Sequence, residues 1–527
     1  MQTRNLKITI LAFTVLLICS GCSKWLDKPR PEATVPIDEI GSGTGGLDAA
    51  LTGAWAYWTY NTGPTGNLFV YPEAMGDYVA GTNVVNSTNR LFRVYQRQLN
   101  SEGYDMIGET LQRASRAENL ANLVIKSARE SPPSDAAWKV NGNRVIGEAH
   151  FLRAWIHFEY LRLEGDPWNT KNVAANASAR GPLLRFKPQL TLQDIPQART
   201  PLSAAYDSII ADLKLAEQLI PEVYNPAIHD ASFQARSNRF AASAMLAKVY
   251  WQQNDFNNAL AQIEKVIGPA TGVSAFPLAS NFDQVYKRSG ITNTTNSTTR
   301  SEVILEYVAA PPSKIYTLAG LQMDNAWTRG TTTTLPVNWF YFSRYFMNLT
   351  SFDMVRDKRY RELINPNYTR TSGGKTYTGW SSRKFNVASN LVFIRAAELV
   401  LMRAEINARK NLVEASLNDL NLVRARAGLL PLTPANFNNP QLLVNEVIRE
   451  RAREMFAEGY RSHELKRLGS LTDGQPDEVF FVSGDREDID FGMEGLGGPT
   501  PVKWNNRGLI WNIPLGELTI NPLANNN

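Results

Sequence analysis

The sequence is almost devoid of cysteine, because Cys19 and Cys22 are the only two among 527 residues. Both lie near the N-terminus, so no disulfide can staple the body of the chain, whose stability must come from packing. Histidine is nearly as scarce, with four residues, and none occurs in a zinc motif such as H-E-x-x-H. The chain also lacks a G-x-S-x-G elbow and a phosphate-binding loop, which are motifs of serine hydrolases and nucleotide-binding proteins.

A strong excess of either charge is missing as well. The net charge is +5, and Arg4 and Lys7 stand before an N-terminal apolar run, which leaves +3 on the remainder. So small a bias does not favour nucleic acid, whose binding proteins usually present a strongly basic surface. We therefore expect no nucleic-acid partner.

Long apolar runs are absent after the one that extends from Ile8 to Ile18. With Arg4 and Lys7 before it and small residues behind it, this run has the three parts of a secretory signal. It is too short to cross the hydrocarbon core of a bilayer, about 30 Å thick, which takes about 20 apolar residues. The sequence therefore predicts export and no other segment that spans a membrane.

Cys22 follows directly on two small residues. This arrangement resembles a bacterial lipoprotein signal, in which such a cysteine is lipidated and becomes the first residue of the mature chain. Cys19 departs from the pattern, which usually has Leu at that place, so an ordinary secretory signal cut nearby is the alternative. The lipoprotein interpretation gives a signal peptide over 1–21, a lipidated Cys22 and a Pro- and Gly-rich flexible linker over 22–46.

Amphipathic helices are predicted where apolar residues recur three and four positions apart. Those segments are 47–60, 105–130, 144–164, 203–220, 239–268, 393–427 and 440–458. The segment 239–268 divides into two helices around Asn254, and its small and large apolar positions resemble a tetratricopeptide repeat. A looser copy covers 393–427. Two copies are few for a free-standing solenoid, so we expect the repeats to brace a larger structure.

The remaining long segments, 60–100 and 270–385, are rich in Gly, Asn, Thr and aromatic residues without a helical period. Stretches this long without regular structure are usually functional. The predicted fold is therefore mostly α, with a helical-repeat scaffold at about 105–268 and 390–470. A large loop-rich half with few short strands completes it.

Four blocks of the sequence carry a family resemblance. In chain order they are GEAHFLRAWIHFEYLRLEGDPWN at 147–169, KFNVASNLVFIRAAELVLMRAEI at 384–406, RERAREMFAEGYRSHELKRLG at 449–469 and IPLGELTINPLANNN at 513–527. They resemble blocks of the SusD-like (SusD/RagB) family of nutrient-binding outer-membrane lipoproteins. Ser462, His463 and Glu464 depart from the pattern, which more often has aromatic residues and Asp there. All four blocks belong to the scaffold, so they indicate the family better than the ligand.

This resemblance implies a single SusD-like domain over 47–527, anchored by its lipid to the outer membrane and facing outward. It implies a partner, a SusC-like TonB-dependent barrel over which the lipoprotein closes as a lid. The implied ligand is an oligomeric nutrient, most often a glycan and sometimes a peptide, contacted by the loops. Binding and delivery of this kind need no cofactor and break no bond.

A glycan site needs flat aromatic platforms and polar side chains that bond to hydroxyl groups. The loop-rich segments offer both, and the residues that we select as candidate ligand contacts are Trp327, Trp339, Tyr341, Arg344, Asn338, Tyr71 and Asp77. For each aromatic residue the alternative is a buried anchor that holds its loop. No catalytic residue and no metal ligand is predicted.

Other chemistry has weaker support in the sequence. His150 and His157 share a helix face, but packing explains them without a metal. Glu302 and Glu306 could act as the carboxylate pair of a glycoside hydrolase, yet they flank a Val-Ile-Leu run typical of a strand. The acidic run 485–490 lacks the spacing of an EF-hand. A lipid-anchored glycoside hydrolase and a non-binding interaction scaffold remain the two alternative functions.

Overall fold

The computed structural model describes residues 43–59, 64–81, 94, 106–225, 227–229, 233, 236–288, 300–307, 340–372, 375–384, 390–472 and 503–525. Helices make up most of these residues, and the strands are few and short. This composition confirms the predicted mostly helical fold class.

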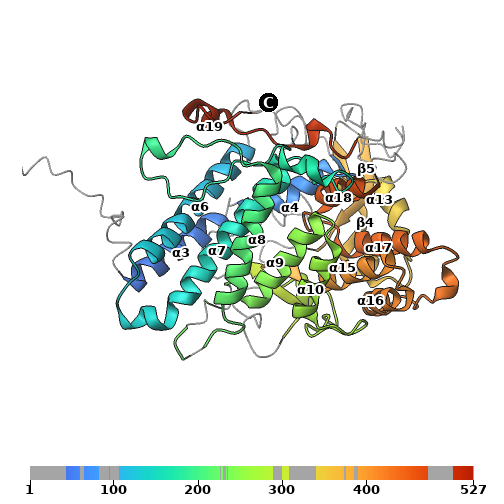
Figure 1. The fold of residues 1–527 in the computed structure, drawn as a ribbon. Coiled ribbons are helices and arrows are strands. Elements are labelled where there is room, and N and C mark those ends of the chain that lie inside the picture. The colour runs from blue at the N-terminus through green and yellow to red at the C-terminus, as the bar shows by residue number, and fades with distance from the viewer. Residues whose placement is uncertain are drawn as a thin grey trace, which may run out of the picture.

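The helices form a continuous array in which each one contacts the next along the chain. Figure 1 shows this array from α6, at the left, to α16 and α17, at the right. Its members are α6 (Met106–Glu130), α7 (Ala136–Glu164), α8 (Leu202–Leu219), α9 (Arg239–Gln252), α10 (Phe256–Ile267), α15 (Ala396–Arg409), α16 (Val413–Arg426) and α17 (Pro440–Met455). An additional helix, α3 (Thr44–Thr59), packs on α6 and α7.

Two of the helix pairs turn in the same way. Asn254 between α9 and α10 has φ 57°, and Asn411 between α15 and α16 has φ 59°. Asn tolerates this left-handed backbone region better than most residues, so it suits a tight turn between antiparallel helices. The two hairpins are consistent with the tetratricopeptide-like repeats predicted at 239–268 and 393–427.

The prediction of loops over 60–100 is wrong for residues 64–75, which form helix α4 (Pro64–Met75). Every described side chain from Asn67 to Met75 is buried. A helix that is enclosed on all sides has no polar face and therefore no amphipathic period. Pro72 inside the helix also argues against a helix at the level of sequence.

Two predicted helix boundaries also differ from the structure. α7 begins at Ala136 rather than 144, because Asp135 caps it by accepting a hydrogen bond from the backbone N–H of Trp138. Residues Leu391–Arg395 form strand β6, so the helix predicted from 393 begins only at Ala396. An apolar strand that runs directly into an apolar helix cannot be separated from it by hydrophobic pattern alone.

Within the described residues the strands form three antiparallel pairs. These are β1 (Val79–Gly81) with β3 (Phe340–Phe342), β2 (Val303–Tyr307) with β6, and β4 (Ile364–Ser372) with β5 (Lys375–Ser382). β2 confirms that the run between Glu302 and Glu306 is a strand. The strands of the described part of the chain pair two by two and do not form a central sheet.

Shorter helices connect these parts. They are α11 (Asp283–Tyr286), α13 (Arg344–Thr350), α14 (Lys358–Leu363), α18 (Arg461–Thr472), α19 (Leu515–Ile520), and the 3-10 turns η1 (Val173–Ala177), η2 (Leu192–Asp194), η4 (Pro434–Asn436) and η5 (Arg507–Leu509). α18 packs against α4 and α9, and so joins N-terminal, middle and C-terminal parts of the chain.

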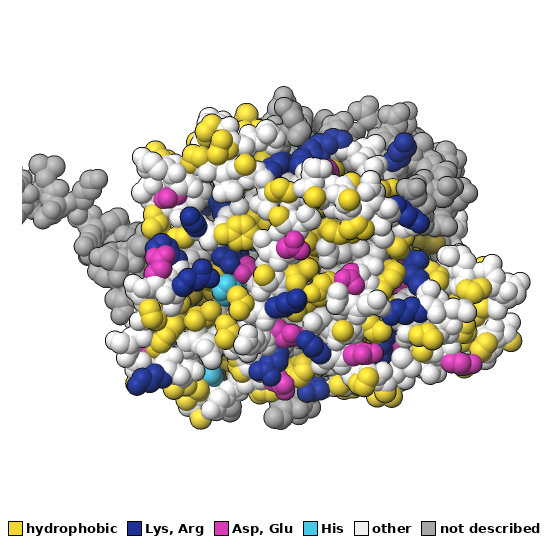
Figure 2. All heavy atoms as spheres, viewed as in Figure 1, with side chains coloured by type: hydrophobic (Ala, Val, Ile, Leu, Met, Phe, Trp, Pro, Cys, Tyr) yellow, Lys and Arg dark blue, Asp and Glu magenta, His cyan; other side chains and the backbone are white. Residues whose placement is uncertain are grey.

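One hydrophobic core extends from Ala54 to Trp511 and includes side chains of the array and of the strands. A smaller apolar cluster lies between α3, α6 and α7. Figure 2 shows acidic and basic side chains interspersed with apolar ones over the visible face. None of the helices in the described part of the chain has both the length and the apolarity needed to cross a bilayer.

Candidate functional site

The two segments predicted to carry the ligand-binding loops meet in the structure. β1 and β3 pair so that Ala80 lies opposite Tyr341. Below this pair, the backbone N–H of Ser343 donates to the carbonyl oxygen of Tyr78 at 2.8 Å, and its hydroxyl donates to the carbonyl oxygen of Asp77 at 2.7 Å. The junction therefore fixes an interior part of one predicted loop segment against an interior part of the other.

The junction contains two of the predicted ligand contacts. Tyr341 is the central residue of β3, and Arg344 is the first residue of α13, whose N-cap is Ser343. Trp327, Asn338 and Trp339 lie outside the described residues, and the chain from 308 to 339 leads into β3. The structure thus places the backbone of Tyr341 and Arg344 at one location and leaves all five as predictions.

Tyr71 and Asp77 have a different environment, because both are completely buried. The two carboxylate oxygens of Asp77 accept from Nε and Nη2 of Arg461 at 2.6 and 2.8 Å. The Tyr71 ring packs against Trp511 with centroids 5.2 Å apart. Their burial gives both a structural role in this conformation, the buried-anchor alternative, and we leave them out of the proposed ligand site.

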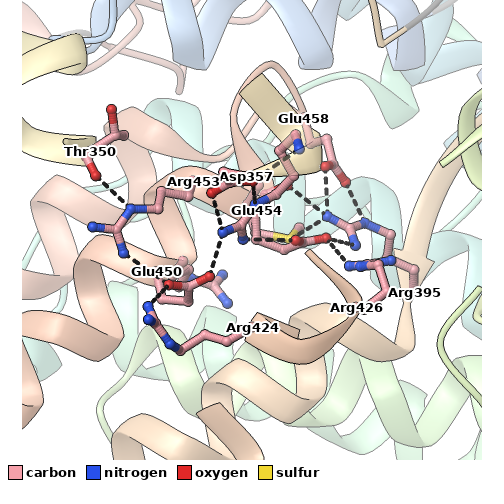
Figure 3. Close-up of polar contacts among 12 residues, drawn as sticks. Thr350, Asp357, Arg395, Arg424, Arg426, Glu450, Arg453, Glu454 and Glu458 are labelled. Atoms are coloured by element: carbon pink, nitrogen blue, oxygen red, sulfur yellow. Dashed lines mark hydrogen bonds and ion pairs between the residues drawn. The ribbon is translucent and has the colours of Figure 1, made fainter. Parts of the chain in front are cut away.

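A buried network of ion pairs contacts the end of α13, the helix that follows β3 (Figure 3). Its centre is Arg395, at the end of β6, whose guanidinium donates to Glu302, Glu454 and Glu458 at 2.7–2.9 Å. Arg426 of α16 bonds to Glu302 at 2.9 Å and to Glu454 at 2.5 Å. The network therefore connects β2, β6, α16 and α17.

The same network extends toward α14. Arg359 binds Asp357 with two bonds of 2.8 and 2.9 Å, Glu454 at 3.2 Å and Glu450 at 2.6 Å. Arg453 donates to Glu450 at 2.8 Å and to the carbonyl oxygen of Thr350 at the end of α13 (Figure 3). Charged side chains of α17 thereby bind both α13, which follows β3, and α14.

The electrostatics of this network favour fixed charges. Burial raises the pKa of Glu454, but Arg426, Arg395 and Arg359 outweigh it and hold that pKa well below its ordinary value. Burial lowers the pKa of Lys384 to about 8, against the opposing effect of Glu458, to which its ammonium donates at 2.6 Å. Glu454 is bonded to three arginines and Lys384 to Glu458, so these charged groups are suited to holding the surrounding elements together.

The network was not predicted, although the sequence contains a signal for it. The blocks at 384–406 and 449–469 place charged residues on helices that are otherwise apolar, and most of these charges are buried in ion pairs. Glu398 pairs with Arg451 at 3.3 Å, and Glu405 with Arg467 at 3.0 Å. Charges at positions that the helical period assigns to the core indicate partners inside the molecule.

The histidines singled out on α7 make separate hydrogen bonds to carboxylates. His150 bonds to Asp212 of α8 at 2.7 Å, and His157 bonds to Glu118 of α6 at 2.8 Å. They therefore face different helices. In the described part of the chain, no three His, Cys, Asp or Glu side chains come together as a possible metal site. The acidic run 485–490 lies outside the described residues.

The carboxylates considered for glycoside hydrolysis are fixed and buried as well. Glu302 bonds to Arg395 and Arg426, and Glu306 bonds to Arg288 at 3.2 Å. Both side chains are no more than 2% exposed. A carboxylate pair of a glycosidase flanks a bound sugar in a cleft, and this pair does not.

The cavity at the centre of the described helices is too small to hold an oligosaccharide. Where α4, α7, α9, α15 and α17 meet, a cavity of about 50 Å³ remains, lined by side chains such as Trp155, Lys248 and Glu398. Ligand pockets usually measure about 300–1,000 Å³. An open groove of about 510 Å³ lies between α6 and residues 189–195, but its lining residues include no aromatic ring for sugar stacking.

Comparison with known proteins gives a consistent result. A family model described as the SusD family matches residues 232–527, and one described as starch-binding associating with outer membrane matches residues 70–251. The SusD-like protein P2 of Formosa agariphila is 23% identical over 496 residues, which cover 88% of this chain and 91% of that protein.

Solved structures agree with the fold. A SusD superfamily protein from Bacteroides thetaiotaomicron superimposes with a TM-score of 0.71 at 16% identity, covering 93% of this chain and 99% of that one. A laminarin binding SusD-like protein gives a TM-score of 0.63 at 19% identity, covering 92% and 99% of the two chains. Because the family match extends over more than half of the sequence, this chain belongs to the SusD family.

Proposed function

We propose that this protein is a cell-surface binding protein that captures an oligosaccharide and delivers it to a SusC-like TonB-dependent barrel. The observation that carries the proposal is the β1–β3 junction, where both predicted loop segments are fixed together on a rigid SusD-family scaffold. A family model that names starch binding, a structural neighbour that binds laminarin and another described as a putative sugar binding protein support a glycan as the ligand. An oligopeptide is the alternative ligand.

The physical basis of binding would be stacking and hydrogen bonding. Aromatic rings provide flat apolar platforms for sugar faces, and Trp327, Trp339 and Tyr341 are the proposed platforms. Asn338 and Arg344 supply the donors and acceptors that hydroxyl groups need. Arg453, which is paired with Glu450, donates to the carbonyl oxygen of Thr350 and so holds the end of α13 before ligand arrives, which lowers the ordering cost of binding.

The proposed anchor and partner follow from the family. Cys22 would carry the lipid, the linker 22–46 would give reach from the outer membrane, and the body would close over the barrel. Closure would enclose the glycan between the two proteins, and no bond of the ligand would be broken.

The first experiment is a binding screen with soluble protein that begins after Cys22. Neutral gluco-oligosaccharides, acidic oligosaccharides and oligopeptides are tested by calorimetry, and each mixture is then examined by chromatography for cleavage. Binding without cleavage supports the capture function, whereas shorter products would establish a glycoside hydrolase. Recovery of a TonB-dependent barrel with the tagged lipoprotein from detergent-solubilised membranes tests delivery.

Single substitutions locate the site. Trp327→Ala, Trp339→Ala and Tyr341→Ala should each weaken binding by about tenfold if the ring stacks on a sugar. Tyr57→Ala is the matched control, because Tyr57 is an exposed aromatic residue on α3, on the scaffold side. Unchanged binding in all three loop variants would overturn the proposed site, whereas no binding of any ligand in the screen would favour a non-binding scaffold.

A further inference from the structure

α18 carries a buried histidine that the proposed ligand-binding role does not use. The His463 side chain is 2% exposed, and neither of its ring nitrogens has a hydrogen-bond partner within the part of the chain that the structure describes. α18 itself is enclosed, since it contacts both α4 and α9 (Figure 1). A buried polar group normally has a partner, so this imidazole needs an explanation.

His463 borders a small cavity of about 20 Å³ between α18, α7, α9, α15 and α17. Arg162 and Arg467 also line this cavity, and the Nε–H donor of each is buried without a partner among the described residues. Three residues of the cavity wall, from α7 and α18, therefore carry polar atoms without partners among the described residues. An apolar void has no such lining.

The charges around the cavity are balanced. Each cationic side chain on its wall pairs with a carboxylate: Arg162 with Glu159, Lys248 with Glu398 at 3.1 Å, Arg451 with Glu464 at 2.8 Å, and Arg467 with Glu405 at 3.0 Å. Burial, and then the cations Arg162, Lys466 and Lys248, lower the pKa of His463 well below its ordinary value. The imidazole is therefore neutral and offers one donor and one acceptor.

The ligand of such a cavity must be neutral, must both donate and accept hydrogen bonds, and must be very small. A water molecule needs about 10–15 Å³ and two to four polar partners, and the cavity provides both. We propose that this cavity is a structural water site, in which water donates to the acceptor nitrogen of His463 and accepts from Nε of Arg162 and of Arg467. The water would join α18 to α7 by hydrogen bonds that neither helix makes directly.

A larger space lies beside the site. Arg162, Lys248, Glu398 and Tyr460 line both this cavity and the cavity of about 50 Å³ beside it. The larger cavity has room for further water by the same measure. The water site belongs to the scaffold and does not depend on which ligand the loops bind.

A high-resolution crystal structure of the soluble protein tests the proposal directly. Density for one water is expected about 3 Å from a ring nitrogen of His463 and from the two arginine Nε atoms. A cavity without density would overturn the proposal. So would an anomalous peak at this place after a bromide soak, because it would assign the site to an anion.

Thermal unfolding of variants tests whether removal of the His463 imidazole lowers or raises Tm. If water binds, His463→Leu should lower Tm by about 1 °C or more, because a side chain of similar volume without polar atoms leaves the arginine donors and the water short of a partner. If the cavity is dry, the same substitution removes an unsatisfied imidazole and Tm rises, which would overturn the proposal.

Two further variants complete the comparison. His463→Gln keeps one donor and one acceptor, so it should retain the water density and most of the Tm. Ser462→Ala is the matched control, because the Ser462 hydroxyl is also buried without a described partner but does not line the cavity. Its Tm should stay equal to that of the wild type or rise, and a fall as large as that of His463→Leu would overturn the assignment to water.

Discussion

At the scale of single residues, buried charge determines how this protein is held together. Glu454 is completely buried and accepts from Arg395, Arg426 and Arg359, which belong to three separate segments. Moving such groups out of water costs several kcal/mol per ion, so each depends on its partners. Removal of one partner leaves the others buried and incompletely neutralised.

We therefore predict that Glu454→Gln lowers the free energy of unfolding by about 3–5 kcal/mol, the usual cost of breaking a buried pair. The measurement is urea unfolding followed by circular dichroism. Glu222→Gln is the control, because Glu222 and its partner Arg239 are about half exposed, and an exposed pair contributes at most about 1 kcal/mol. Equal effects of the two substitutions would show that the network does not hold the fold.

Glu73 on α4 gives a pH-dependent prediction. Burial raises its pKa from 4.5 to about 7, although the backbone N–H groups of Tyr460 and Gly459 and the charge of Arg461 oppose the rise. The folded protein then keeps a proton that the unfolded chain releases above its lower pKa. Stability from this group is therefore present below about pH 4.5, falls as the pH rises to about 7, and is constant above that value.

Glu73→Gln should remove this part of the pH dependence. Relative to wild type, the variant gains up to about 3 kcal/mol between pH 4.5 and pH 7, from a shift of about 2.5 units at 1.36 kcal/mol each. Urea unfolding at pH 5 and pH 8 measures the change. Glu164 has a pKa raised to about 7 by its own burial, so part of the dependence remains in the variant. Parallel curves for the two proteins would contradict the prediction.

At the scale of elements, close helix contact at Gly147 sets the distance between α7 and α8. A Cβ atom there would lie 2.7 Å from Cγ1 of Ile220 and 2.9 Å from Cβ of Leu219. Gly147→Val should therefore lower stability by about 1–3 kcal/mol through overpacking. Gly45→Val on α3 is the control, since no atom lies within 4 Å of the added Cβ. Thermal unfolding of the two variants separates packing from helix propensity, and equal Tm values would contradict the prediction.

The sequence was informative for those elements that have one apolar and one polar face. α10 has such a face, and Asp255 caps it by accepting from the backbone N–H of Asn258. α4 and α18 lack one, because α4 is enclosed by apolar neighbours and α18 buries its charges in ion pairs such as Arg461–Asp77. A helical period in hydrophobicity arises where one face of a helix meets the core and the other meets solvent. A helix that is buried on all sides has no such period, so the pattern does not predict it.

At the scale of the whole molecule, the sequence predicted which segments carry the candidate site but not how they meet. Ala80 and Tyr341 pair across about half of the chain, and no local pattern encodes that pairing. The aromatic candidates Trp327 and Trp339 follow from composition, whereas the burial of Tyr71 follows from tertiary packing alone. The composition of the loops thus suggests the chemistry of the ligand. Tertiary packing determines which aromatic side chains are exposed and can contact it.

The last prediction concerns cooperativity. One core includes side chains from Ala54 to Trp511, and the ion pairs of Glu454 connect the helical array with the segments that carry the junction. Neither part can unfold without exposing the core and the charges of the other, so we expect one transition in which far-ultraviolet circular dichroism and tryptophan fluorescence coincide. Loss of the Glu454 charge should move this transition as a whole. Two separated transitions in the wild type would contradict a single domain, and a splitting seen only in Glu454→Gln would identify the network as the link between its halves.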